Sequence, residues 1–344
     1  MLSFNGSPVA RVDDQKHLGL ILHPSLSFVN HINEKTKKAK KNIGIIKHLN
    51  NFLPFFSLNQ MYSALVRSHL DYCDIVYHIP PKIHLPPLGM SLHDHMEMIE
   101  KIQYQAALAV TGAWQGTSRV KLYEDLGWES LSDRRISRRV LQIHKIIDGK
   151  TPKYLRDCLP PNRNVVLNLP NVFQEFRTRT DRYAGSFFPN AITLWNNFIS
   201  SFPNFPTFLE LKNHLISLFR PKSNSIFGIH DPISLRYLFQ LRVGLSKLRH
   251  HKKRHNFLDT PSDTCLCKTG VEDTDHYFIH CPFYNTHRVD LKSKVSTIIS
   301  RNELDLNISS NLLLYGHDSF SFQDNRDVLL TTLEFIVKSN RFQN

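Results

Sequence analysis

Three of the five cysteines in the chain lie close to a histidine near its C-terminal end. Cys265, Cys267, His276 and Cys281 follow the pattern C-x-C, eight residues, H, four residues, C. Thiolate and imidazole groups are the usual ligands of structural zinc, and four of them complete its tetrahedral shell. The pattern predicts a Zn²⁺ ion that closes a short loop. Two alternatives remain open: ordinary unliganded thiols, or His280 in place of His276.

The charge balance favours a polyanionic partner. The chain has 43 Lys and Arg against 30 Asp and Glu, which gives a net charge of +13. Nucleic acid is the commonest cellular polyanion. The first residues, MLSFNGSPVARVDD, lack the features of a signal peptide, and no apolar run approaches a membrane span. Because the odd cysteine count also fits a reducing compartment, we expect an intracellular protein, nuclear or cytoplasmic, that has no membrane partner.

Four clusters of cations are the candidate contacts to nucleic acid. They are Lys37, Lys38, Lys40, Lys41 and Lys47; Arg134, Arg135, Arg138 and Arg139; Arg177, Arg179 and Arg182; and Lys247, Arg249, Lys252, Lys253 and Arg254. A solvated surface is the ordinary interpretation of such charges. The density of the first cluster exceeds what solubility requires, and point charges along a helix can follow a phosphate backbone.

The spacing of apolar residues predicts a mainly α-helical fold (α+β) with a small β-element at the N-terminus. The β-element carries an Asn5-Gly6 turn signal and the apolar run 18–22. Helices are predicted from residue 28, where Ile32, Ala39, Ile43 and Ile46 share one face, and over 58–76, 93–111, 118–126, 132–147 and 328–338. Proline-rich segments at 79–89 and 159–171 interrupt them. In the helix over 58–76, Met61, Leu65 and Leu70 are the expected core residues.

Motifs of catalysis are mostly missing from the sequence. There is no phosphate-binding G-x-x-x-x-G-K-[ST], no G-x-G-x-x-G, no G-x-S-x-G and no H-E-x-x-H. Asp13 and Asp14 form an adjacent acidic pair of the kind that binds Mg²⁺ in polymerases.

Several stretches, in order along the chain, resemble the C-terminal half of the reverse transcriptase of non-LTR (LINE-class, jockey-like) retrotransposons. They are 16–49, which begins KHLGLILHPSLSF, 58–77, 100–146, 176–197 and 235–284, which contains the CLCKTG loop. The resemblance implies a palm remnant over 1–27, a helical thumb over 28–115, a helical linker over 116–220, and a basic region with a compact CCHC zinc-knuckle-like motif over 221–344. The parent activity is that of an RNA-directed DNA polymerase.

One departure from the family bears on activity. The family's metal motif is aromatic-x-Asp-Asp, upstream of the KHLG stretch, whereas Arg11 and Val12 precede Asp13 and Asp14 only two residues before His17. Two-metal nucleotidyl transfer needs carboxylates from two palm segments. We therefore expect a truncated fragment without a catalytic Mg²⁺ site, not an enzyme by itself, that binds RNA or DNA without sequence preference.

Two alternatives to this fragment stay open. The chain is part of an active polymerase whose fingers and palm lie upstream, or it is a zinc-dependent protein-interaction module. In each case we expect apolar surface on the palm-facing side, which favours self-association.

Overall fold

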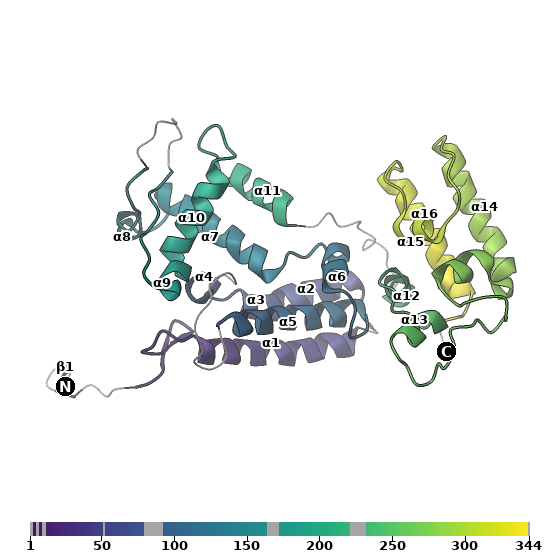
Figure 1. Ribbon diagram of the computed structural model, residues 1–344, viewed down its shortest axis with the longest axis horizontal. Coiled ribbons are helices and arrows are strands. Elements are labelled where there is room, and N and C mark those ends of the chain that lie inside the picture. The colour runs from purple at the N-terminus through teal and green to yellow at the C-terminus, as the bar shows by residue number, and fades with distance from the viewer. Residues whose placement is uncertain are drawn as a thin grey trace. The chain divides into compact units, whose positions relative to one another are not determined.

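The computed structural model describes residues 12–50, 52–78, 92–163, 172–220 and 232–342, and the backbone of 3–4 and 7–8 (Figure 1). As predicted, the protein is mainly α-helical with a small β-element at the N-terminus. The proline-rich segment at 79–89 and most of 159–171 lie outside the described residues.

The chain forms two compact units, each assembled from three separate segments. Unit 1 comprises Met1–Asn42, Ser63–Tyr104 and Trp128–Pro221, and unit 2 comprises Ile43–Tyr62, Gln105–Gly127 and Lys222–Asn344. The division into 1–27, 28–115, 116–220 and 221–344 follows the sequence and stays a prediction.

Two antiparallel hairpins make up the β-element. Strand β1 (Ser3–Phe4) pairs with β2 (Ser7–Pro8), and β3 (Gln15–His17) pairs with β4 (Leu20–Leu22). Leu18 and Gly19 connect β3 and β4 with φ angles of 45° and 82°, which is the two-residue turn that suits a hairpin. Of the apolar run 18–22, only Leu20–Leu22 form a strand, because Leu18 belongs to the turn and is 83% exposed.

Helix α1 (Val29–Leu49) buries the apolar face that the sequence predicted. Ile32, Ala39, Ile43 and Ile46 are buried, and Phe28 is half-buried just before the helix. The five predicted contact lysines of this helix fall on its other side and are exposed, whereas Lys35 is half-buried.

The helix predicted over 58–76 is broken into short pieces. They are α2 (Phe55–Met61), the π-helix η1 (Tyr62–Arg67), α3 (Ser68–Leu70) and α4 (Asp74–Tyr77). The buried residues Leu58, Tyr62, Val66 and Leu70 recur every four positions, a wider repeat than 3.6, because a π-turn inserts an extra residue. The expectation of Leu70 in the core was confirmed, whereas that of Leu65 was wrong, since this residue is exposed.

The larger part of unit 1 is a helical core around Trp195. Its helices are α5 (Leu92–Thr111, up to Tyr104), α7 (Leu131–Ile147), α8 (Lys153–Asp157), α9 (Asp181–Gly185), α10 (Phe187–Ile199) and α11 (Phe208–Phe219). Helix α7 packs against α10 and α11. Trp195 is fully buried there, and Phe187, Phe188 and Leu194 pack against the same cluster.

Unit 2 ends in a helical bundle that carries the cysteine cluster. Its elements, besides α2 and the last turns of α1 and α5, are α6 (Arg119–Leu126), α12 (Pro232–Arg242), α13 (Arg249–Arg254), the π-helix η3 (His276–His280), η4 (Pro282–Tyr284), α14 (Asn285–Arg301), α15 (Ser310–Tyr315) and α16 (Phe322–Lys338). Helix α16 packs against α12, α14 and α15. The Ser321 side chain begins α16 by accepting a hydrogen bond from the backbone N–H of Asp324.

The predicted helices over 93–111, 118–126, 132–147 and 328–338 are confirmed as α5, α6, α7 and the last part of α16. In the described part of the chain, none of the helices combines the length and the apolar character that a membrane crossing needs.

Candidate metal centre and nucleic-acid interface

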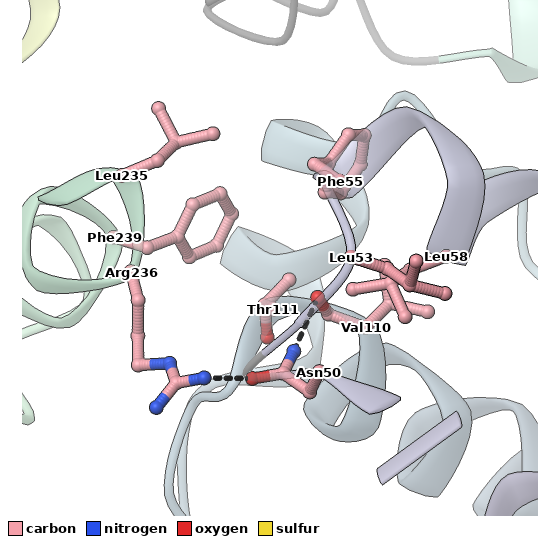
Figure 2. A pocket seen from close by; sticks show the side chains of 9 residues that line it. All are labelled: Asn50, Leu53, Phe55, Leu58, Val110, Thr111, Leu235, Arg236 and Phe239. Carbon is pink, nitrogen blue, oxygen red and sulfur yellow. Dashed lines mark hydrogen bonds between the residues drawn. The ribbon is translucent and has the colours of Figure 1, made fainter. Parts of the chain in front are cut away.

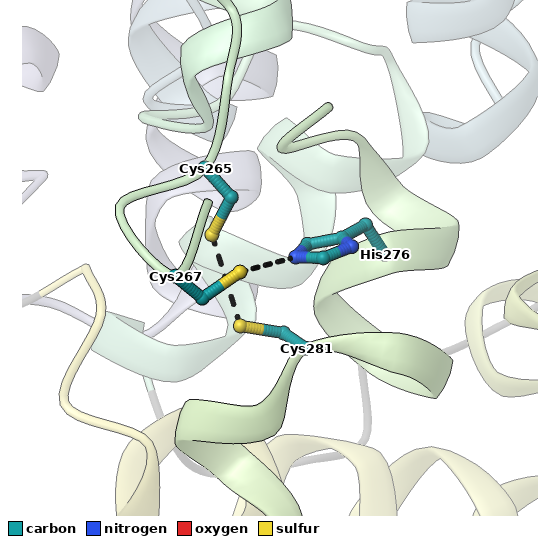
Figure 3. A group of neighbouring side chains, drawn as sticks. All are labelled: Cys265, Cys267, His276 and Cys281. Carbon is teal, nitrogen blue, oxygen red and sulfur yellow. Dashed lines mark hydrogen bonds between the residues drawn. The ribbon is translucent and has the colours of Figure 1, made fainter. Parts of the chain in front are cut away.

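The four predicted metal ligands meet in unit 2 (Figure 3). One ligand atom from each of Cys265, Cys267, His276 and Cys281 lies within 4.8 Å of all the others. The Sγ atoms of Cys265 and Cys281 are 3.7 Å apart, and Cys267 Sγ is 3.1 Å from His276 Nε2. Ligands of a tetrahedral zinc with Zn–S bonds of about 2.3 Å lie about 3.8 Å apart. The cluster can therefore hold a metal ion with little rearrangement, and it is the one such group of His, Cys, Asp and Glu among the described residues.

A tight turn positions the first two cysteines. The backbone N–H of Cys265 donates to the carbonyl of Gly270 at 2.8 Å, and that of Lys268 donates to the carbonyl of Cys265 at 2.9 Å. Lys268 has a φ angle of 63°, and Thr264 and Val271 pair as an antiparallel bridge that closes the turn. Both thiols thus come from one small hairpin-like loop.

The π-turn of η3 positions the other two ligands. The Asp273 carboxylate accepts a hydrogen bond from the backbone N–H of His276 at 2.7 Å, and the N–H of Cys281 donates to the carbonyl of His276 at 2.7 Å. His276 is buried beside the thiols, whereas His280 is exposed and lies outside the cluster. This geometry favours His276 over His280 as the fourth ligand.

Arg288 supports the loop over residues 265–281, called the metal loop below, and no local sequence pattern predicts this role. It is buried, and its guanidinium donates to the carbonyls of Phe278 and Cys281, each at 2.7 Å. Burial lowers the pKa of Arg288. The buried cation thus satisfies carbonyls of the segment that carries Cys281, which fixes its backbone.

The thiols differ in how readily they ionise. Burial raises the pKa of Cys265 to about 12 and also raises the pKa of Cys281. Burial is also the largest single effect on Cys267 and acts in the same direction, but hydrogen bonds with the hydroxyl and backbone of Thr269, with Cys265 and with His276 together outweigh it and lower the pKa of Cys267 to about 6. Since metals bind thiolates, an incoming ion must displace the protons of the two buried thiols.

The metal loop is attached to the C-terminal end of the described chain. Glu272 is buried and pairs with Arg341, and the hydroxyl groups of Tyr277 and Ser339 are 2.6 Å apart. The Tyr277 ring also packs against Phe335 and Phe342. The loop is therefore part of a helical body and is not an isolated knuckle.

The lysine cluster of α1 is open to solvent. Lys37, Lys38, Lys40, Lys41 and Lys47 are all exposed. Lys38 pairs with Glu34 at 2.6 Å. For the other four, no carboxylate of the described residues lies within ion-pair distance, which leaves their charges available to an external anion.

The arginine cluster of α7 has a different role from the one predicted. Arg135 and Arg139 are 2% and 1% exposed. Arg139 donates to Asn190 Oδ1 and to the carbonyl of His78, and Arg135 donates to the carbonyl of Leu70. The prediction that these two side chains contact nucleic acid was wrong, because a phosphate cannot reach them in the folded unit. They connect α7 to the segment around α4 and to α10.

The two other arginines of α7 face a pair of aspartates. Arg134 Nε is 2.8 Å from Asp71, and Arg138 Nη1 is 3.0 Å from Asp74. Both guanidinium groups are partly buried. Burial raises the pKa of Asp74 against the opposing effect of Arg138. Arg134, Arg135 and Arg138 thus form an internal ion-pair network with Asp71 and Asp74. The sequence alone could not reveal this network, because it does not show that the two aspartates lie next to α7.

The third cluster is exposed: Arg177 and Arg179 lie in the segment before α9, and Arg182 lies in the first turn of α9. Arg182 donates to the carbonyl of Ser25 at 2.7 Å. The structure places these residues in unit 1, and they remain candidates for phosphate contacts.

The fourth cluster lies around α13, and each of its cations has a partner within unit 2. Lys252 pairs with Asp259 at 2.6 Å and Lys253 with Asp263 at 3.2 Å. Lys247, Arg249 and Arg254 donate to backbone carbonyls, those of Phe342, Ser262 and Gly244. Lys253 and Arg254 are nevertheless exposed, so each can leave its internal partner and bind an external anion.

Comparison of the chain with models of protein families, with curated proteins and with solved structures gives no match.

Proposed function

We propose that the chain is a zinc-binding, non-catalytic nucleic-acid-binding protein related to the C-terminal half of a LINE-class reverse transcriptase. The observation that carries the binding proposal is the row of exposed lysines on α1, of which only Lys38 has a carboxylate of the described residues within ion-pair distance. Such a row neutralises phosphates along a strand and releases their counterions. Because the lysines contact phosphates and not the edges of the bases, the binding does not depend on nucleotide sequence, and both RNA and DNA can bind.

The donor set of the metal centre supports zinc. Three thiols and one imidazole suit a tetrahedral, borderline-soft ion, whereas Mg²⁺ prefers six oxygen ligands. With all four positions taken by side chains, no coordination site is left for substrate, and this is typical of structural zinc. The role proposed for Zn²⁺ is therefore to hold the loop over 265–281 in its fold.

The acidic pair near the N-terminus supports the absence of polymerase chemistry. The Asp14 carboxylate accepts a hydrogen bond from Asn30 at 2.7 Å, and both Asp13 and Asp14 are exposed on the segment before β3. Two-metal transfer needs a second carboxylate held opposite such a pair. No further Asp, Glu, His or Cys gathers with them in the described ranges.

The test is a fluorescence-anisotropy titration with an RNA–DNA hybrid at two salt concentrations. The triple variant Lys37→Gln, Lys40→Gln, Lys41→Gln removes three exposed charges that pair with no carboxylate in the described part of the chain. A matched variant, Lys150→Gln, Lys294→Gln, Lys338→Gln, removes three lysines that pair with carboxylates. Both variants lower the net charge by the same amount.

We expect the first variant to reduce the slope of log K against log salt by about 2 to 3, since each phosphate contact contributes about 0.7 to 0.9. The matched variant should leave the slope within about 1 of its original value. Equal effects in both variants would assign the binding to overall charge and contradict the role of α1. No binding at low salt would contradict the proposed function as a whole.

Exposed apolar side chains beside the metal loop support a second candidate, a zinc-dependent protein-interaction module. Leu266, between the two cysteines of the turn, is 67% exposed, and Phe283 is 61% exposed. Contacts through such side chains would be insensitive to salt. Binding of a protein partner that salt does not weaken, together with no binding of the hybrid, would favour this candidate.

A further inference from the structure

Unit 2 contains a partly open cavity of about 550 Å³ that is separate from the metal loop. Its wall comes from several segments: Lys47 on α1, Gln105 on α5, Trp114 and Gln115 in the segment after α5, Arg236 on α12, and Phe257 after α13. The volume lies within the usual range of about 300 to 1,000 Å³ for small-molecule sites. A neighbouring space, drawn in Figure 2, has a volume of only about 20 Å³, which is roughly that of one water molecule.

One part of the cavity wall is aromatic. The rings of Trp114 and Phe257 lie 5.0 Å apart at an angle of 42°. Trp114 is partly exposed, whereas Trp128 and Trp195, the two other tryptophans, are buried. A flat ring left open to solvent at a cavity is a surface on which another planar ring can stack.

A second part of the wall is positively charged and fixed in place. The Arg236 guanidinium donates to the side-chain oxygen of Asn50 (Figure 2). Asn50 in turn donates to the carbonyls of Ala109 and Val110 at 2.8 and 3.0 Å. Gly112 has a φ angle of 67°, and a Cβ atom there would lie 2.6 Å from Arg236 Nε. Glycine thus allows the guanidinium to approach the end of α5.

The remaining polar groups complete a distinctive lining. Lys47 adds a second cation, and none of the described residues that line the cavity is acidic. The side-chain amides of Gln105 and Gln115 hydrogen-bond to each other at 3.2 Å and can donate to or accept from a ligand edge. The cavity therefore offers cations, an aromatic face and amides together. Inorganic phosphate would use only the cations, and an apolar ligand would remove water from both cations without compensating their charge.

We infer that this cavity binds a single nucleotide unit, with the base on Trp114 and Phe257, its edge at Gln105 and Gln115, and the phosphate at Lys47 and Arg236. The unit is either a free nucleotide or one unpaired nucleotide of a strand, since both present the same base and phosphate. The inference goes beyond the lysine row of α1, because it holds for a free nucleotide even where no polymer binds.

The experiment is a titration of the full chain with AMP, CMP, GMP, UMP, adenosine and inorganic phosphate. Binding is followed by quenching of tryptophan fluorescence and by saturation-transfer NMR of the ligand. The variants are Trp114→Leu and Lys47→Gln, with Lys292→Gln as a matched control, because Lys292 is an exposed lysine of unit 2 outside the cavity. A trinucleotide serves as the strand form of the ligand.

We expect saturable binding of at least one nucleotide, stronger than that of adenosine or phosphate alone. Trp114→Leu should weaken it about tenfold in the NMR readout, Lys47→Gln should weaken it as well, and Lys292→Gln should leave it unchanged. A trinucleotide that binds much more tightly than the mononucleotides identifies a strand as the source, and equal affinity identifies a free nucleotide. Binding unaffected by Trp114→Leu, phosphate binding as tight as nucleotide binding, or no saturable binding of any nucleotide would each overturn the inference, whatever the hybrid titration gives.

Discussion

The carboxylate of Glu272 accepts hydrogen bonds from Nε and Nη2 of Arg341, at 2.7 and 2.8 Å. It also accepts one from the backbone N–H of Arg249 at 2.9 Å. Glu272 lies between the two halves of the metal loop, so this one buried side chain joins the loop, the start of α13 and the residues after α16. Forked pairs of this kind are among the stronger polar interactions in proteins.

Glu272→Gln should lower the free energy of unfolding of unit 2 by about 2 kcal/mol, because it removes a charge-assisted pair and leaves Arg341 without its anion. Urea unfolding followed by the release of bound zinc measures the effect. The matched change Asp259→Asn breaks the exposed pair with Lys252 and should alter stability by about 0.5 kcal/mol or less. A similar loss in both variants would contradict the anchoring role of Glu272.

Cys281→Ser should reduce the zinc content well below one ion per chain and destabilise unit 2, because a hydroxyl is a poor substitute for a thiolate ligand. Metal analysis of the purified protein, together with a thermal melt before and after addition of a chelator, provides the measurement. Cys158→Ser is the control, since Cys158 is an exposed free cysteine in unit 1. A chelator that leaves the melt of the original protein unchanged would argue against a structural metal.

Arg139→Met should destabilise unit 1 by about 3 kcal/mol, because it leaves the buried carbonyl of His78 and the side chain of Asn190 without their donor. Arg177→Met, at an exposed position, should change stability by about 0.5 kcal/mol or less. Urea unfolding monitored by the fluorescence of the buried Trp195 compares the two. A change in the affinity for nucleic acid alone, without loss of stability, would contradict the internal role of Arg139.

Acid should destabilise the protein through its buried histidines. Burial, together with Arg254, His250 and His255, lowers the pKa of His251 to about 4, against the opposing effect of Asp273. The folded state therefore binds fewer protons than the unfolded state, whose histidines titrate near 6.5. The contribution of neutral His251 to the free energy of unfolding is fully present above about pH 6.5 and declines as the pH falls toward 4.

For His251 alone, this linkage amounts to about 2 kcal/mol between pH 7.5 and pH 5. Urea midpoints at the two pH values measure it, and His251→Gln should make the difference between them smaller. The ring accepts hydrogen bonds from Ser246, so the glutamine keeps an acceptor at the site. An unchanged difference in the variant would exclude His251 as the titrating group.

Apolar side chains near the N-terminal hairpin should promote self-association. Val12, Leu18 and Leu26 are exposed in unit 1. Leu18→Asn removes the most exposed of them and places a residue that tolerates positive φ in the turn. Sedimentation velocity over a range of concentrations should show less oligomer in this variant than in Val120→Asn, a control on α6 with comparable exposure. Equal behaviour of the two would place the self-association elsewhere.

Local sequence patterns predicted the local features of this protein well. The 3.6-residue repeat predicted α1, α5 and α7, and the spacing of the cysteines predicted a ligand set that the fold brings together. Features that depend on residues far apart in the sequence could not be predicted, because no local pattern encodes them. Arg135 and Arg139 look like a surface cluster until α4 and α10 cover them, and Arg288 looks like any helical arginine until it reaches the carbonyl of Cys281. The cavity beside Trp114 is lined by segments about 200 residues apart in the sequence, so it could not be predicted from local patterns either.

The interleaved composition of the two units has a consequence for synthesis of the protein. Residues 43–62 belong to unit 2, yet its last segment begins only at residue 222. At about 5 to 20 residues per second, the ribosome takes about 15 to 60 s to translate the residues that follow residue 62. Throughout that time the apolar face of the last turns of α1 stays exposed, because the residues that cover it have not all been synthesised. We therefore expect chaperones to bind the nascent chain. The high sequence separation of these contacts also predicts slower refolding of unit 2 than helical content alone suggests.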